Sequence, residues 1–205
     1  MNQQELIQQL IQGNESAYRA CFNLFSDRVY NTALSILQNQ EDAEDITQEV
    51  FIEVYRSIKS FRQEASLQTW IYTITTNKCN DHLKKQRSKK RFAFLTSIFG
   101  DDDALQHDKP HFDHPGVLLE NKEHAKVLFF ALNKLPDKQK MAFTLSRIEG
   151  LSNKEAADAM QTSISAFESV LHRANENLKT TLSEYYKNNL KEGASFYKTF
   201  LLMLY

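Results

Sequence analysis

Residues 67–87, LQTWIYTITTNKCNDHLKKQR, decide the fold class because they contain the strongest candidate for a β-strand in the chain. The β-branched run at 69–76 would favour a strand on residue propensity alone. The apolar residues nevertheless recur at the i, i+3, i+4, i+7 spacing of one helix face, at Leu67, Trp70, Ile71 and Ile74. Because the flanking segments are also helical in pattern, the sequence predicts a helix here, capped by Ser66.

The segments before this helix repeat the three-and-four spacing. Residues 2–12, 15–38 and 41–60 each place apolar side chains on one face, and Gly13 separates the first two. Asn14 is a suitable N-cap for the second of these helices. The first part of the chain is therefore expected to be helical throughout.

The composition of the 205-residue chain agrees with an all-α fold. Its 41% of hydrophobic residues suffice for one ordinary domain or two small ones, while only 5 Gly and 3 Pro argue against a turn-rich β-sandwich or barrel. The two cysteines lack the spacing of a disulfide framework or a zinc site, which fits a reducing cytoplasm. Neither a spanning helix nor a signal peptide is indicated, so no stable membrane insertion is expected.

A break in the helical pattern divides the chain into two small helical domains. Residues 92–120 lose the period and are acidic, so they are expected to be a flexible linker between domains at 1–91 and 121–182. Three histidines in this linker lack the phase or the cysteines of a metal site, and no metal is assigned to them.

The second domain contains the pattern of a helix-turn-helix. Ser152 and Glu155 form an S-x-x-E capping box at the start of a helix over 153–160, and a short break precedes a longer helix from Ile164. Two helices joined by so short a turn suggest this motif, although many helical hairpins do not bind DNA.

One predicted helix has a strongly acidic face. Residues 41–53, EDAEDITQEVFIE, hold six acids and no base, and four of the acids line one stripe with Gln48 beside them: Asp42, Asp45, Glu49 and Glu53. Such a stripe either meets a cationic partner or is a solvated helix face whose first acids suit the helix N-terminus.

A basic block follows the aromatic run. Residues 78–91 hold seven cations against Asp81: Lys78, Lys84, Lys85, Arg87, Lys89, Lys90 and Arg91. In a chain with a net charge of −1, this block suggests local contact with a polyanion, the alternative being a solvated helix end. Aromatic and polar residues followed by cations suit single-stranded nucleic acid, unless Trp70 and Tyr72 are simply core residues. The sequence has no phosphate loop, nucleophile elbow or zinc-protease motif, so an enzyme is not indicated.

Two long segments resemble the extracytoplasmic-function (ECF) group of sigma-70 family initiation factors of bacterial RNA polymerase. Residues 17–83 contain DITQEVF within AYRACFNLFSDRVYNTALSILQNQEDAEDITQEVFIEVYRSIKSFRQEASLQTWIYTITTNKCNDHL and resemble region two of that family. Residues 135–182, LPDKQKMAFTLSRIEGLSNKEAADAMQTSISAFESVLHRANENLKTTL, resemble region four. The resemblance implies a factor, without a cofactor, that binds core polymerase and directs promoter-specific transcription initiation.

The resemblance also implies residue roles in region two. The D-x-x-Q-E-x-F helix would dock on a basic coiled coil of the largest polymerase subunit through Asp45, Gln48, Glu49 and Glu53. Residues 62–67 would form the loop that captures a flipped base of the minus-ten element. The implied minus-ten contacts are Arg62, Trp70, Tyr72, Asn77, Lys78, Lys84, Lys85 and Arg87.

Region four would bind the minus-thirty-five element and the polymerase flap. Where many relatives read V-K-S-R-L-H-R-A-R, this chain has FESVLHRAN at 167–175, so three cations are missing. The implied base or phosphate contacts are Lys154, Ser163, Ser165, Glu168, Ser169, His172 and Arg173. Glu168 either accepts a hydrogen bond from a cytosine or lowers non-specific affinity.

Other expectations concern partners and rival functions. The resemblance to this family implies an anti-sigma factor as a partner. The C-terminal extension 183–205 is expected either to pack on the second domain or to dock a regulator or a membrane surface. A stand-alone helix-turn-helix regulator of duplex DNA is the alternative, but it would need neither the acidic stripe nor a base pocket around Asn77.

Overall fold

The computed structural model describes residues 2–99 and 122–188, and in this part of the chain every regular element is a helix. The first group comprises α1 (Gln3–Ile11), α2 (Glu15–Leu37), α3 (Gln40–Ser57), the 3₁₀ turn η1 (Ile58–Ser60) and α4 (Leu67–Phe99). The second comprises α5 (Lys122–Asn133), α6 (Asp137–Phe143), the π-helical turn η2 (Thr144–Ile148), α7 (Asn153–Ala159) and α8 (Ile164–Asn188). The predicted all-α class is confirmed, including the helix across the β-branched run.

The predicted helix starts are confirmed by their hydrogen bonds. The side chain of Asn14 accepts from the backbone N–H of Ser16, and the Ser66 hydroxyl accepts from that of Thr69. Ser152 and Glu155 form the full reciprocal capping box at the start of α7. The hydrogen bonds that Ser152 donates also lower the pKa of the Glu155 carboxyl.

Two elements differ from the expected boundaries. The helix α4 continues to Phe99, beyond the domain boundary placed at residue 91, so the start of the expected linker is helical. The helix predicted over 137–149 is α-helical only as far as Phe143 and then widens into η2. The rest of the expected linker and the extension beyond Asn188 lie outside the described residues.

Two hydrophobic cores correspond to the two expected domains. The first joins α1, α2, α3 and α4 around fully buried residues that include Leu10, Ile36, Ile58 and Leu67. The second domain contains a cluster between α5, α6 and α8, and another beneath α7 and the start of α8. In the first domain, the buried residues of the helices largely follow the three-and-four apolar spacing of the sequence.

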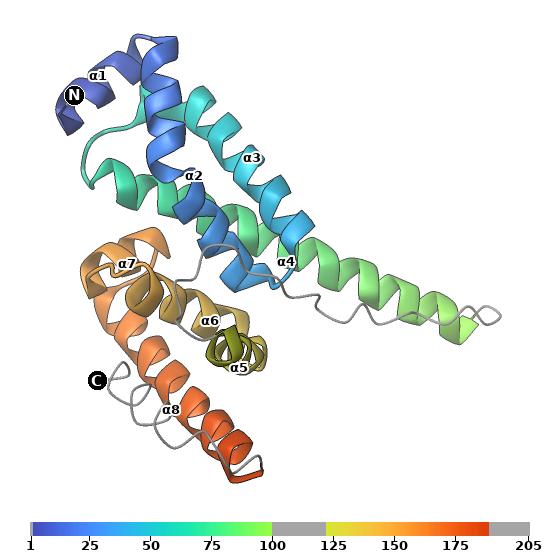
Figure 1. Ribbon diagram of the computed structural model, residues 1–205. Coiled ribbons are helices and arrows are strands. Elements are labelled where there is room, and N and C mark those ends of the chain that lie inside the picture. The colour runs from blue at the N-terminus through green and yellow to red at the C-terminus, as the bar shows by residue number, and fades with distance from the viewer. Residues whose placement is uncertain (1, 100–121, 189–205) are drawn as a thin grey trace.

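The two domains pack directly on each other. Figure 1 shows α1 to α4 as the upper group and α5 to α8 as the lower group, with the C-terminal half of α4 projecting from the body. Helix α4 packs on α7, and α2 packs on α6 and η2. Tyr72 of α4 belongs to a core cluster of the second domain, and Met141 of α6 belongs to the core of the first. In the ranges 2–99 and 122–188, no helix combines the length and apolar character needed to cross a membrane.

Candidate nucleic-acid interface

The acidic stripe of α3 faces solvent. Ala43, Ile46 and Val50 are buried on one side of the helix, which leaves Asp45, Gln48 and Glu49 exposed on the other. Glu53 continues the stripe and is half-buried. The N-cap of this helix is Asn39, whose side chain accepts from the backbone N–H of Asp42 at 2.9 Å. The four residues predicted to bind polymerase thus lie together on one helix, and three of them are exposed.

One ion pair and one histidine–carboxylate contact join an edge of this stripe to α4. Glu49 Oε2 lies 3.2 Å from Lys78 Nζ, and Asp42 Oδ2 lies 3.2 Å from His82 Nε2. Lys78, predicted to contact DNA, therefore neutralises part of the surface predicted to contact polymerase. Both partners of the Glu49 pair are partly exposed, so the pair contributes little stability and leaves both side chains free to exchange partners.

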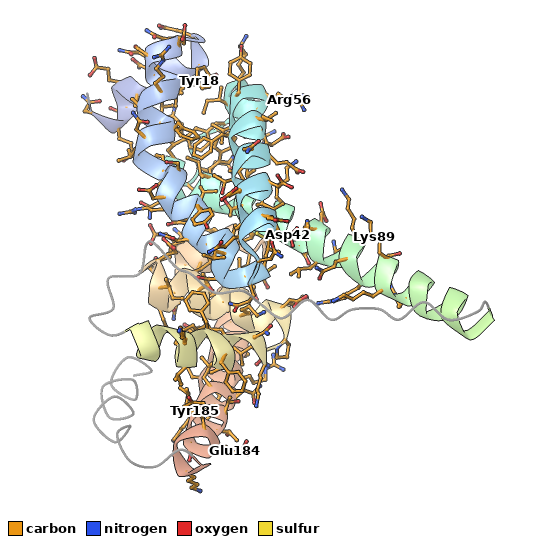
Figure 2. All side chains as sticks on the ribbon, turned by 45° about the vertical axis from the view of Figure 1, so that its right-hand side comes forward. Tyr18, Asp42, Arg56, Lys89, Glu184 and Tyr185 are labelled. Atoms are coloured by element: carbon orange, nitrogen blue, oxygen red, sulfur yellow. The ribbon has the colours of Figure 1, made fainter. Side chains whose placement is uncertain are left out.

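The basic block occupies the projecting half of α4. Lys84, Lys85 and Lys89 are exposed, and Figure 2 shows Lys89 extending from the helix into solvent. Arg87 is also exposed but forms an ion pair with Asp137 at the start of α6. The block presents an open cationic surface, of which one guanidinium is already engaged by the second domain.

The aromatic part of the predicted minus-ten surface lies at the N-terminal end of α4. The Trp70 ring packs on Phe61 with ring centroids 5.0 Å apart and is half-buried. Arg62 and Asn77 are exposed. A cleft of about 750 Å³ lies between the 60–65 loop with Trp70 and the second domain, which contributes side chains including Lys154 and Ser163. Residues predicted for the two DNA elements therefore line one cleft.

Tyr72 differs from the other predicted minus-ten residues, because it is only 2% exposed. Its hydroxyl donates to Glu149 Oε2 at 2.5 Å, and burial together with the charge of Glu149 raises the pKa of Tyr72. The expectation that Tyr72 faces DNA does not hold in this conformation. The physical reason is that α4 packs on the second domain, a contact between residues far apart in the sequence.

The helix-turn-helix is formed by α7 and α8, joined through a turn at residues 160–163. Phe167 and Leu171 of α8 are buried in one cluster with Ala156, Ala157 and Ala159 of α7. This packing fixes the angle between the two helices. The opposite face of α8 is exposed, including Ser165, Glu168, Ser169, His172 and Arg173, and Lys154 of α7 is exposed beside it. The five predicted residues of α8 therefore share one accessible face, whereas the exposed Lys154 and Ser163 line the cleft toward the first domain.

Several of these side chains also make local hydrogen bonds. Ser163 caps α8 by accepting from the backbone N–H of Ala166 at 3.2 Å. Ser169 donates to the carbonyl of Ser165, and Arg173 donates to the carbonyl of Ser169. Asn153 of α7 donates to Glu168 at 3.1 Å and holds that carboxylate on the exposed face of α8 that was predicted to contact bases. The face is consequently polar and close to neutral rather than basic.

Sequence reasoning missed a polar network between the domains. Glu149 accepts from Tyr72 and, through Oε1, from the hydroxyl of Thr32 at 2.9 Å. Thr76 donates to the carbonyl of Ala159 at 2.7 Å. Burial raises the pKa of the Glu149 carboxyl, and the two hydroxyl donors and Arg28 partly oppose that rise. No local pattern marks Glu149 in the sequence, because both of its donors come from the other domain.

Two family models match the chain. Sigma-70 region 2 matches residues 21–89, and Sigma-70 region 4 matches residues 127–178. The first match spans the acidic helix α3 and most of the basic block of α4, and the second spans the helix-turn-helix. The matches occur in the same order as the two structural domains.

Curated relatives match nearly end to end. The chain is 28% identical over 194 residues to the ECF RNA polymerase sigma-E factor of Haemophilus influenzae, covering 89% of this chain and 96% of the relative. It is also 28% identical over 182 residues to the ECF RNA polymerase sigma factor SigW of Bacillus subtilis, covering 87% and 95%.

Solved structures share the fold. The structure of CnrH in complex with the cytosolic domain of CnrY matches with a TM-score of 0.62 at 20% identity, covering 89% of this chain and 97% of that chain. The sigma factor RpoE in complex with the anti-sigma factor NepR from Bartonella quintana matches with a TM-score of 0.60 at 20% identity, covering 81% and 96%.

The fold and its two surfaces define a two-domain helical protein with a helix-turn-helix and a separate acidic and basic face. Together with the matches above, they place the chain in the sigma-70 family, in its ECF group.

Proposed function

We propose that this protein is an ECF-type RNA polymerase sigma factor that binds core polymerase and directs promoter-specific transcription initiation. The observation that supports this most directly is the placement of an exposed carboxylate stripe on α3 beside an exposed cationic surface on α4. One domain thereby offers a face for a basic protein partner and a face for a nucleic-acid strand. This role requires no catalytic chemistry from the chain itself.

The stripe of α3 is the proposed docking site for the basic coiled coil of the largest polymerase subunit. Asp45, Gln48 and Glu49 are exposed and would pair with cations of that partner, with Glu53 extending the contact. Because complementary charge mainly steers encounter and fixes register, several carboxylates on one rigid helix suit this task. On docking, Lys78 would lose Glu49 and become free for a phosphate.

The N-terminal part of α4 is the proposed minus-ten site. Arg62, Trp70 and Asn77 would hold a base flipped out of the non-template strand, while Lys78, Lys84, Lys85 and Arg87 would follow its backbone. Flipping costs least where pairing is weak, so this pocket would start strand opening without ATP. Tyr72 would join the site only after the second domain leaves it.

The helix-turn-helix is the proposed minus-thirty-five site, with its domain also contacting the polymerase flap. The N-terminal residues of such a helix meet base edges in the major groove, which assigns Ser165, Glu168, Ser169 and His172 to bases. Lys154 and Arg173 are assigned to phosphates, and Ser163 to positioning of the helix start. With so few cations, this domain would bind its element weakly without polymerase.

Further partners are proposed from relatives. Two structurally similar proteins, CnrH and RpoE, were solved in complex with the cytosolic domain of CnrY and with the anti-sigma factor NepR, respectively. By analogy, we propose an anti-sigma factor for this chain and a cytoplasmic location. A stand-alone helix-turn-helix regulator is the second candidate. The exposed acidic stripe disfavours it, since carboxylates on the surface repel DNA.

Reversing the charge of the stripe tests the proposal. The double variant Asp45→Lys, Glu49→Lys should lose co-purification with core polymerase and reduce run-off transcription at least about tenfold, because like charges would then face each other. The double variant Glu176→Lys, Glu184→Lys carries the same charge change on exposed sites of α8 and should retain both activities. Polymerase binding that survives reversal of the stripe would overturn the docking assignment.

A further inference from the structure

The contact between the two domains centres on one carboxylate. Glu149 lies at the end of η2, where its N–H bonds to the carbonyl of Thr144 and Gly150 adopts a φ of +72° that reverses the chain. This local geometry points the side chain toward α2 and α4. Each of its oxygens accepts one hydroxyl from the first domain, from Thr32 and from Tyr72.

The hydroxyl donors are fixed by burial. Thr32 is fully buried in α2 and Tyr72 is 2% exposed in α4, so neither has water as an alternative partner while the domains are packed. Hydrogen bonds to an ionised acceptor are roughly twice as strong as neutral ones. Arg28 of α2 adds favourable charge beside the same carboxylate. Loss of Glu149 would remove the acceptor that both buried hydroxyls share, which favours separation of the domains.

Closure also occupies residues of the proposed minus-ten site. Tyr72 is covered, Arg87 is paired with Asp137, and Thr76, which precedes Asn77, is bonded to the carbonyl of Ala159. The cleft lined by Arg62 and Trp70 is closed on its far side by α7 and the turn after it. The second domain therefore covers one side of the strand-binding surface of the first.

We propose that the two domains form a self-masking closed state, in which Glu149 latches the second domain over the strand-binding surface until the domains separate. The masking part rests on the proposed function, since it assigns that surface to single-stranded DNA. The latch itself is a property of the free chain. Contacts between domains of one chain resemble transient interfaces, so an opening motion is expected even though Tyr72 and Met141 add apolar contact to this junction.

The single tryptophan of the chain reports directly on closure, because Trp70 lines the cleft between the domains. In the full-length protein, Glu149→Ala should increase acrylamide quenching of Trp70 fluorescence and raise the radius of gyration measured by X-ray scattering. The affinity of this variant for a fluorescein-labelled thymidine-rich single-stranded oligonucleotide should rise about tenfold. The reason is that fewer molecules are in the closed state, in which the second domain covers the strand-binding surface. Thr32→Val, which keeps the shape but removes one donor, should shift all three readouts in the same direction by less.

The matched control is Glu184→Ala, which removes an exposed carboxylate far from the junction, near the C-terminal end of α8 in Figure 2. It should leave all three readouts unchanged, and helical circular dichroism verifies that each variant is folded. Unchanged quenching and scattering in both Glu149→Ala and Thr32→Val would overturn the latch. Opening without a gain in oligonucleotide affinity would overturn masking. Quenching and scattering need neither polymerase nor DNA, so they test the latch even if run-off transcription refutes the proposed function.

Discussion

The two segments proposed to read DNA differ sharply in charge. Residues 78–91 of α4 carry seven cations against one carboxylate, whereas residues 164–175 of α8 carry Arg173 against Glu168. Phosphate neutralisation supplies affinity with little sequence information, and base edges supply specificity. If the proposed DNA contacts are made, α4 would provide most of the binding energy for nucleic acid, and α8 would be a selective but weak reader that depends on polymerase for its affinity.

The structure adds a physical reason for this division. The cations of α4 lie on a helix that projects into solvent, where charged side chains remain hydrated at little cost (Figure 1). The reading face of α8 instead uses its short polar side chains in bonds to its own backbone and to α7, as at Ser169 and Glu168. The cationic surface of α4 therefore attracts any polyanion, whereas the polar side chains on the exposed face of α8 are held in place by their hydrogen bonds.

The largest effect on DNA binding is expected from neutralising the basic block. The triple variant of Lys84, Lys85 and Lys89, each to Gln, should lower affinity for single-stranded DNA by about tenfold or more at moderate salt. The slope of log affinity against log salt should decrease by about 2, because each phosphate contact on a single strand contributes roughly 0.7. Fluorescence anisotropy across a salt series measures both quantities.

The control removes three exposed lysines from the second domain instead, by changing Lys126, Lys138 and Lys187 to Gln. The net charge change is the same, so any effect of total charge is matched. Equal losses in the two triple variants would contradict the assignment of affinity to α4.

A smaller effect, of opposite sign, is expected at Glu168. Glu168→Lys should raise affinity for duplex promoter DNA roughly threefold to tenfold, because a carboxylate on the face proposed to meet the polyanionic duplex is replaced by a cation. It should also change the preferred minus-thirty-five sequence, as Asn153 loses its acceptor on the reading face. Selection from a randomised duplex library measures the preference, and Glu176→Lys, farther along α8, serves as the control. An unchanged preference would remove Glu168 from the reading surface.

The smallest effect on DNA binding is expected at Lys140, a cation of the second domain that is withdrawn from solvent. It is 5% exposed, and burial lowers its pKa from 10.5 to about 8. The unfolded chain binds the proton of the Lys140 ammonium group more tightly than the folded chain does. Burial of this charge therefore destabilises the folded protein by its full amount below pH 8, and the destabilisation disappears as the pH rises toward 10.5. Lys140→Met should raise the free energy of unfolding at neutral pH by roughly 1–3 kcal/mol, and DNA affinity should stay unchanged.

Chemical denaturation at several pH values measures this effect. The gain of Lys140→Met over the natural chain should shrink between pH 8 and 10.5. Lys138→Met, at an exposed neighbouring position, should show no such dependence. A gain that is absent, or that stays constant with pH, would show that burial of the ammonium group has no cost.

Local patterns predicted most of the fold because the information they use is local. The periodicity of 67–76 correctly outweighed its β-branched composition, and the caps at Asn14, Ser66 and Ser152 form as expected. The boundary of α4 was harder to place, because the basic residues up to Arg91 and the chain after them lack the apolar period that marks a packed helix. Apolar periodicity alone therefore does not mark where such a helix ends.

Local sequence patterns sufficed to predict the all-α class, the two-domain order, and the acidic, basic and helix-turn-helix surfaces, because each depends on residues within a few helical turns of one another. The burial of Tyr72, the pairing of Lys78 with Glu49 and the contact of Glu149 with the first domain became evident only from the folded arrangement of the helices. These contacts link residues distant in the chain, and their existence depends on how whole helices pack rather than on any local pattern.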